Sequence, residues 1–206
     1  MNQLHPDLRV VRTRQAIRNA FFELLEEKGF EAITVKDITT RATINRATFY
    51  AHYDDKFALM NALEEEMMQE LNNITTENIP ALIKLIEDDN NKIETSPIAV
   101  ATLTYIGQNR TFMKALLGPH GNIAFQLRLK DFIWKAIFAN DAHPFIKKNK
   151  LLVPGQYLAS YIASAHIGVI QQWLMDGTRE TPEEMANILS TMTINGIVYA
   201  AGLKHP

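Results

Sequence analysis

The sequence predicts an all-helical protein with two parts, an N-terminal group of short helices and a larger helical region after it. Glycine (9) and proline (8) together make up 17 of the 206 residues, or about 8%. Average proteins contain roughly 12% of these two residues, so few positions here interrupt a helix. No stretch alternates apolar and polar residues between hairpin turns, so strands have little support. Apolar residues instead recur at spacings of three and four, which is the repeat of a helix with one buried face.

The first expected helix covers about residues 9–28. Ile17, Phe21 and Leu24 lie three or four positions apart and form one apolar stripe along it. Gly29 follows, and glycine is the usual residue where a helix ends in the left-handed conformation. We therefore expect this helix to end near Lys28.

Two short helices and a longer one are expected next. Thr34 and Asn45 are both favoured N-cap residues, and Asp37 stands three positions after Thr34, where a capping box has its acid. Residues 43–45 interrupt the apolar pattern and form the turn between the short helices. The three helices are expected over about 35–42, 46–53 and 54–73.

The larger region begins with a polar stretch and continues with apolar helices. Residues 72–96 are broken by Pro80 and bounded by Pro97, so only a short helix flanked by loops is expected there. Thr181 precedes Pro182 and two acids, which together are a strong helix start. The later helices are expected over about 97–108, 111–117, 122–140, 154–176 and 182–203.

Composition excludes several classes of protein. The chain has no cysteine, so disulfides, thiolate metal sites and cysteine nucleophiles are excluded. No apolar run approaches the roughly 20 residues that a membrane span needs, and the N-terminus lacks the apolar core of a signal peptide. We expect a cytoplasmic protein with no membrane partner, no metal and no cofactor.

The segment after Asn45 divides its side chains between two faces. Phe49 and Tyr53 lie four residues apart and are expected to face inward with Ile38 and Ile44. The outward face is small or hydrogen-bonding, without a large aliphatic residue to bury, and it consists of Ala47, Thr48, Tyr50 and Ala51. Two short helices with a three-residue turn and such a face have the proportions of a helix-turn-helix, and ordinary helical cores also contain short helices with tight turns.

Charge placement agrees with a nucleic-acid partner but does not require one. The formal net charge is −2, which argues against general coating of nucleic acid and leaves room for a local basic face. Arg9, Arg12, Arg14 and Arg18 form a run without an intervening acid. A solvated helix face is the simpler interpretation of that run taken alone.

Together these residues carry a resemblance. The segments Thr34-Val35-Lys36-Asp37-Ile38 and Ile44-Asn45-Arg46-Ala47-Thr48-Phe49-Tyr50-Ala51-His52-Tyr53, with Ala42, Lys56 and Leu59, are similar to the DNA-binding domain of the TetR/AcrR family of bacterial regulators. Asn45, Thr43 and Tyr53 stand where serine, glycine and phenylalanine are common. The resemblance implies a DNA-binding domain over residues 9–69 and a helical effector-binding and dimerisation domain over 70–206.

The resemblance also implies a set of contacts with double-stranded DNA. Arg46, Ala47 and Thr48 would read base edges, because arginine binds guanine in two places and alanine allows close approach. Side chains at the start of the second helix, at the end of the third and at the start of the fourth would bind phosphates of the DNA backbone. The full set of expected DNA-binding residues is Thr34, Lys36, Asn45, Arg46, Ala47, Thr48, Tyr50, His52 and Lys56.

Two further expectations concern the larger region. The helices over 154–176 and 182–203 are apolar on more than one face, which burial within one chain explains and which a four-helix interface of a homodimer also explains. An effector pocket for an apolar or aromatic small molecule is implied by the resemblance, although each such residue taken singly is more often plain core. The candidate lining residues are Tyr105, Phe112, Phe125, Phe132, His166 and Trp173.

The favoured function is therefore a sequence-specific transcriptional regulator, a ligand-responsive repressor that binds a palindromic operator as a dimer. The alternative is a co-regulator of the same fold that acts through protein contacts. An enzyme is the rival from another class, and no metal-spaced histidines, nucleophile elbow or phosphate-binding glycine loop supports it.

Overall fold

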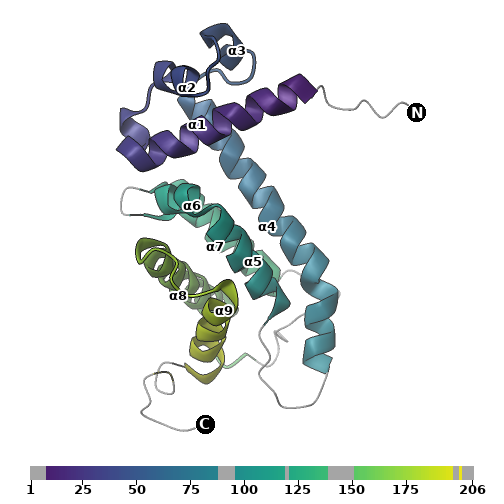
Figure 1. Ribbon diagram of the computed structural model, residues 1–206. Helices are drawn as coiled ribbons and strands as arrows, with labels where there is room; N and C mark the ends of the chain where they lie inside the picture. The colour runs from purple at the N-terminus through teal and green to yellow at the C-terminus, as the bar shows by residue number, and fades with distance from the viewer. Residues whose placement is uncertain (1–7, 88–95, 119–120, 139–150, 197–199, 201–206) are drawn as a thin grey trace, which may run out of the picture. The chain divides into compact units, whose positions relative to one another are not determined.

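The regular elements of the protein are helices wherever the structure describes the chain. The computed structural model describes residues 8–87, 96–118, 121–138, 151–196 and 200, and these contain no strand (Figure 1). The all-helical prediction is confirmed. Internal contacts divide the chain after Met67 into two compact units.

The first unit is built around α1 (Leu8–Ala32), whose apolar stripe is buried as the sequence predicts. Ile17 and Phe21 are fully buried, and Leu24 and Leu25 are nearly so. Gly29 leaves helical geometry with φ 72°, after which the chain makes one more turn. This residue therefore interrupts the helix one position after its predicted end.

The helices α2 (Val35–Arg41) and α3 (Arg46–Tyr50) form the predicted pair of short helices. Thr43 turns the chain between them with φ 55°, and the turn is closed by a hydrogen bond from the amide of Ile44 to the carbonyl of Thr39 (3.0 Å). The third helix ends at Tyr50, three residues before its predicted end, and Ala51 is its C-cap.

The helix α4 (Lys56–Glu87) corrects the prediction for residues 72–96, since it continues through Pro80 without a break. Proline removes one amide donor and so frees the carbonyl one turn earlier. Pro80 and Thr76 are both exposed, so water can satisfy that carbonyl. Residues 88–95 lie outside the described part of the chain.

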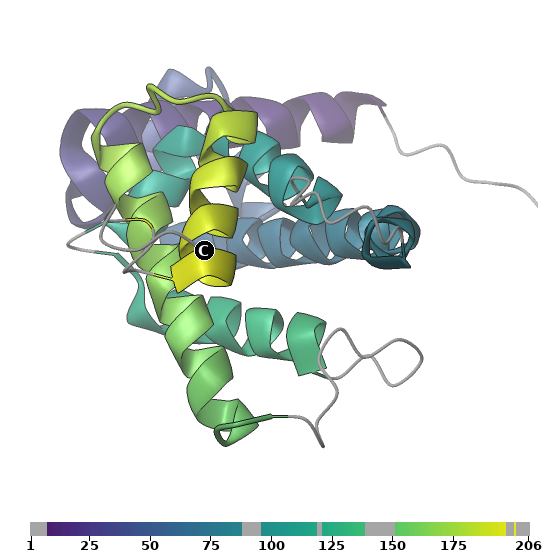
Figure 2. The ribbon, with the colours of Figure 1, turned by 90° about the horizontal axis from the view of Figure 1, so that it is seen from below.

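The second unit places α5 on α9, and both α6 and α7 on α8 (Figures 1 and 2). Gln171 donates to the carbonyl of Leu117 at 2.7 Å, and the indole of Trp173 donates to the carbonyl of Glu180 at 3.0 Å. The helices are α5 (Pro97–Gln108), α6 (Arg110–Leu117), α7 (Ile123–Phe138), α8 (Gly155–Met175) and α9 (Pro182–Ser190).

The last predicted helix, over about 182–203, begins as α9 and changes to a π-helical turn after Ser190. Its start is as expected, with a capping box between Thr181 and Glu184. After Ser190 the chain forms one π-helical turn, η2 (Thr191–Asn195), and Gly196 follows with φ 79°. Of the predicted remainder to 203, residues 197–199 and 201–203 lie outside the described part of the chain. Within that described part no helix is long and apolar enough to cross a membrane.

The left-handed conformation of Thr43 yields a stability prediction. A residue with a Cβ atom loses about 1–2 kcal/mol in this region, while glycine costs about 0.5–1 kcal/mol in chain entropy. Thr43→Gly should therefore raise the free energy of unfolding by about 0.5–1 kcal/mol in a urea titration. Thr43→Ala keeps a Cβ atom and should recover only a small part of this gain, so equal stability of the two variants would contradict the explanation.

Candidate nucleic-acid interface

The helix α3 separates one buried anchor from an exposed polar face. Phe49 is fully buried, as is Ile38 of α2, and the half-buried ring of Tyr53 lies 5.8 Å from that of Phe49 between centroids. On the other side Arg46 and Ala47 are exposed. The division of α3 into an inward and an outward face agrees with the prediction from spacing.

The start of α3 is fixed by the side chain of Asn45. Its Oδ1 atom accepts hydrogen bonds from the amide of Thr48 at 2.7 Å and from the hydroxyl of Thr48 at 2.9 Å. The first bond satisfies an amide that has no partner within the helix. Asn45 and the hydroxyl of Thr48 are therefore engaged in holding the helix, which leaves Arg46 and Ala47 as the outward residues of its first turn.

The start of α2 is fixed by a reciprocal capping box. The amide and hydroxyl of Thr34 both donate to Asp37, at 2.9 and 2.7 Å, and the amide of Asp37 donates back to Thr34. Lys28 also lies 2.7 Å from the carboxylate of Asp37. The ammonium of Lys28 and the donors of Thr34 hold the pKa of Asp37 well below its usual range. Thr34 thus already uses its hydroxyl within the fold, whereas Lys36 is exposed.

Lys56 has partners inside the first unit that the sequence did not indicate. Its ammonium donates to the carbonyls of Phe30 and Glu31, both at 3.0 Å. It also lies 4.7 Å from the ring centroid of Phe30 and 5.3 Å from that of Phe57, within cation–π distance. Lys56 therefore joins the start of α4 to the end of α1, and at most one of its three N–H donors remains for another partner.

An ion-pair cluster joins α2 to α1. Arg41 donates to Glu23 at 2.9 Å and to both oxygens of Glu27, at 2.8 and 2.7 Å. The hydrogen bond from Arg41 holds the pKa of Glu27 below its usual value. Arg41 thus serves to hold α2 against α1.

The nine predicted DNA-binding residues fall between the start of α2 and the start of α4. Six of them are exposed, namely Thr34, Lys36, Asn45, Arg46, Ala47 and Tyr50. Thr48, His52 and Lys56 are half-buried. Tyr50 has 52% of its surface exposed, with its ring edge against Phe49.

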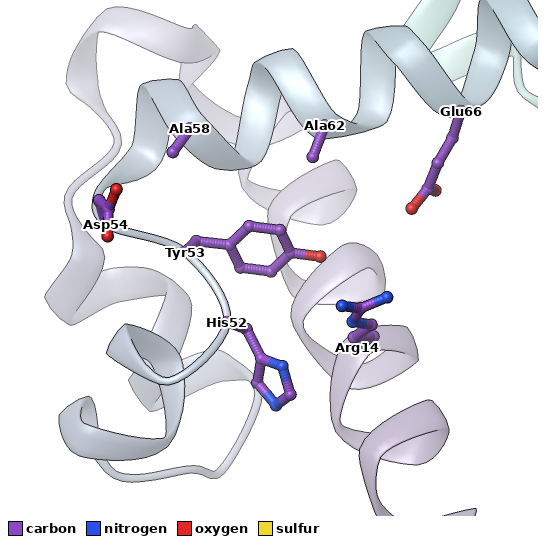
Figure 3. A pocket seen from close by; sticks show the side chains of 7 residues that line it. All are labelled: Arg14, His52, Tyr53, Asp54, Ala58, Ala62 and Glu66. Carbon is purple, nitrogen blue, oxygen red and sulfur yellow. The ribbon is translucent and has the colours of Figure 1, made fainter. Parts of the chain in front are cut away.

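Besides the partners of Lys56, sequence reasoning missed a hollow in this region. Arg14 of α1 and His52 line the same hollow of about 280 Å³, together with Tyr53 (Figure 3). The arginine run predicted a basic stretch, but a separation of 38 positions between Arg14 and His52 gives no local pattern that would place them together.

The six candidate pocket residues of the second unit are distributed between its core and its surface. Phe112, Phe125 and Trp173 are almost fully buried, as core residues are. Tyr105, Phe132 and His166 are half-buried. None of the six lines the hollow in the first unit or the second hollow, of about 350 Å³, beside residues 151–155.

His166 has a defined partner within the second unit. The hydroxyl of Thr193 donates to the carbonyl of Leu189 at 2.7 Å. The Nε2 atom of His166 lies 2.8 Å from the Thr193 hydroxyl oxygen and therefore donates to that hydroxyl. Burial lowers the pKa of His166. The histidine therefore links α8 to the π-helical turn.

Family comparisons agree with this geometry. Residues 17–63 match the family described as bacterial regulatory proteins of the tetR family. Residues 93–195, half of the chain, match the C-terminal region of transcriptional regulators of the same family. The chain belongs to the TetR family of transcriptional regulators. This family consists of transcription factors, so the enzyme alternative is set aside.

Individual relatives support the TetR assignment. A TetR transcriptional regulator from Streptococcus agalactiae 2603V is 25% identical, with a TM-score of 0.61 over 93% of this chain and 99% of that one. NalD, the secondary repressor of the MexAB-OprM multidrug efflux pump in Pseudomonas aeruginosa, shares the fold at 19% identity, with a TM-score of 0.63 over 92% and 98%. YxbF, an HTH-type transcriptional regulator of Bacillus subtilis (strain 168), is 44% identical over 66 residues, which are 32% of this chain and 17% of YxbF.

The Asn45 cap leads to a prediction for the TetR-type helix-turn-helix. Asn45→Ala removes the acceptor for the amide of Thr48 and should cost about 1 kcal/mol in the free energy of unfolding. Asn45→Ser restores a capping oxygen and should stay within a few tenths of a kcal/mol of the natural protein. Urea denaturation followed by circular dichroism measures both; an alanine variant as stable as the serine variant would show that the cap contributes nothing.

Proposed function

We propose that this TetR-family protein is a sequence-specific regulator that inserts α3 into the major groove of double-stranded DNA. The observation that carries the proposal is that α3 buries Phe49 on one face, while its other face is exposed and has no acidic residue. A major groove admits one helix, and the first residues of that helix reach the base edges.

The base-reading residues of the proposal are Arg46, Ala47 and Thr48. Arg46 is exposed at the first position of α3, where a guanidinium can donate to both guanine O6 and N7. Ala47 is exposed and small, which suits contact with a thymine methyl group. The hydroxyl of Thr48 is held by Asn45, so its remaining contribution is as an acceptor or through its methyl group.

Phosphate contacts fix the register of the helix in this proposal. Lys36 of α2 and Tyr50 at the end of α3 are exposed, and His52 is half-buried just after α3. Lysine, tyrosine and histidine side chains all donate to phosphate oxygens. Thr34 would contribute through the start of α2 rather than through its engaged hydroxyl, and Lys56 through the one donor that its carbonyl partners leave.

The proposal includes a homodimer formed through α8. That helix has no Asp, Glu, Lys or Arg in its 21 residues. One side of it is nevertheless exposed, at positions three or four apart: Tyr157, Tyr161, Ala165, Gly168, Gln172 and Met175. A side chain built at Gly168 would meet nothing within 4 Å, so no neighbour in the protomer requires glycine there. An uncharged exposed stripe with a small residue supports a close helix contact with a second copy, and two copies would read a palindrome.

The second unit would regulate DNA binding by the first. The first unit would be the DNA-binding domain, over about residues 9–69, and the second the effector-binding and dimerisation domain, over 70–206. A small apolar or aromatic effector would bind among α5–α8 and favour a conformation in which the two recognition helices no longer fit the half-sites. The protein would then act in the cytoplasm as a repressor that its effector releases from DNA.

Binding to the DNA upstream of its own coding sequence tests the proposed function. A regulator should bind this duplex in gel shifts with an affinity that falls steeply as salt rises, because phosphate contacts release counterions. A co-regulator acting through protein contacts would show no such binding. Absence of salt-dependent binding to any duplex would therefore refute the proposal.

Arg46 and Lys36 should behave differently on replacement. Arg46→Ala should cost about 1–3 kcal/mol of operator binding and relax preference at one base position in each half-site. Lys36→Ala is the matched control, since loss of a phosphate contact should weaken all sequences alike and lower the salt slope by about 0.9 per protomer. Binding to a panel of single-base operator variants measures both; an unchanged preference profile for Arg46→Ala would remove it as a base reader.

Gly168 provides the test of the dimer. The natural protein should sediment as a dimer at micromolar concentration. Gly168→Glu should give a monomer, because it places a charge in the middle of the uncharged stripe while the protomer has room for the side chain. Gln108→Glu, at an exposed position of α5, is the control and should remain dimeric. A natural protein that sediments as a monomer would overturn this part of the proposal.

A further inference from the structure

A polar hollow lies within the first unit, between α1, α4 and the segment that joins α3 to α4. Its volume is about 280 Å³. Ala58 and Ala62, one turn apart on α4, line the hollow with small side chains that leave it open, and the ring of Tyr53 crosses it (Figure 3). The family match begins at residue 17, so Arg14, which lines this hollow from α1, lies outside it.

Three hydrogen-bond donors converge in this hollow. The hydroxyl of Tyr53 points toward the guanidinium of Arg14, and the ring of His52 lies beside them (Figure 3). None of these three polar groups has a hydrogen-bond or ion-pair partner among the residues that the structure describes. Arg14 is exposed, whereas His52 and Tyr53 are half-buried. The surrounding residues therefore limit the movement of the His52 and Tyr53 side chains, while solvent still reaches all three donors.

The two acidic residues of the hollow do not occupy these donors. Glu66 lies 3.3 Å from Arg18, which offsets its charge. Asp54 lies at the opposite end from Glu66 (Figure 3). Burial, followed by the charge of Glu66, raises the pKa of Tyr53, so its hydroxyl keeps its proton and acts as a donor at neutral pH.

We propose that Arg14, His52 and the hydroxyl of Tyr53 form a second phosphate-binding site, separate from the first turn of α3, that holds a phosphodiester of the DNA backbone. The proposal rests on the proposed function, because the phosphate belongs to the operator. It assigns DNA contact to two residues, Arg14 and Tyr53, that neither the helix-turn-helix pattern nor its spacing indicates.

Position favours a DNA phosphate over a free anion. His52 follows the exposed Tyr50 by two residues, so a duplex bound at α3 brings its backbone past this end of the helix. An arginine supplies charge and two parallel donors to a phosphate, and a neutral hydroxyl adds a third donor. A free phosphate has no other contact to hold it at these donors, whereas a DNA phosphate is already held near them by the contacts of α3, which raises its effective concentration there.

The test compares operator binding of Arg14→Gln, Tyr53→Phe and the natural protein over a range of salt concentrations. Arg14→Gln should lower the salt slope by about 0.9 per protomer, which corresponds to about an eightfold loss of affinity per protomer at 0.1 M salt. Tyr53→Phe keeps the ring and should weaken binding about two- to tenfold per protomer with no change in slope, because it removes a neutral donor. Arg179→Gln removes the same charge from an exposed position of the second unit and should bind like the natural protein.

Three outcomes would overturn the inference in distinguishable ways. If Arg14→Gln and Arg179→Gln bind alike while the natural protein binds its operator, the site is refuted and the proposed function stands. If inorganic phosphate raises the thermal midpoint of the natural protein but not that of Arg14→Gln, while the two bind the operator alike, the hollow binds free phosphate rather than DNA. If the natural protein shows no salt-dependent DNA binding, the proposed function fails and this inference fails with it. Equal thermal midpoints by circular dichroism exclude a folding defect in each variant.

Discussion

The functional surface depends on the burial of one ring. The helix α3 has five residues, far fewer than the roughly 12–15 that an isolated helix needs for marginal stability in water. It persists because Phe49 is fully buried against the first unit and Asn45 satisfies its first turn. The same geometry turns Arg46 and Ala47 outward. Removing the anchor would therefore remove the surface as well.

Two cations near α3 hold the first unit together rather than facing a partner. Arg41 joins α2 to Glu23 and Glu27 of α1, and the ammonium of Lys56 is held by carbonyls at the end of α1. Arg14, Lys36 and Arg46 remain exposed. These exposed cations are the ones that can meet DNA phosphates and base edges in the proposed complex.

The sequence predicted those helix ends that depend on interactions between residues close together in the chain. The caps at Thr34 and Asn45 predicted the starts of α2 and α3 at the correct residues, and Gly29 predicted the interruption of α1 to within one residue, because each acts on its own turn of helix. Pro80 misled the prediction, since an exposed proline can stay in a helix when water satisfies the freed carbonyl. The role of Lys56 and the meeting of Arg14 with His52 depend on residues 25 or more positions apart, and no pattern in one sequence specifies such pairs.

The central claim, that the exposed face of α3 reads a DNA sequence, is tested most directly by selecting bound duplexes from a random pool with the natural protein. The account predicts strong enrichment of one motif made of two inverted half-sites, with a guanine in each half-site where Arg46 docks. Recovery of duplexes without a shared motif, or no recovery at all, would contradict it.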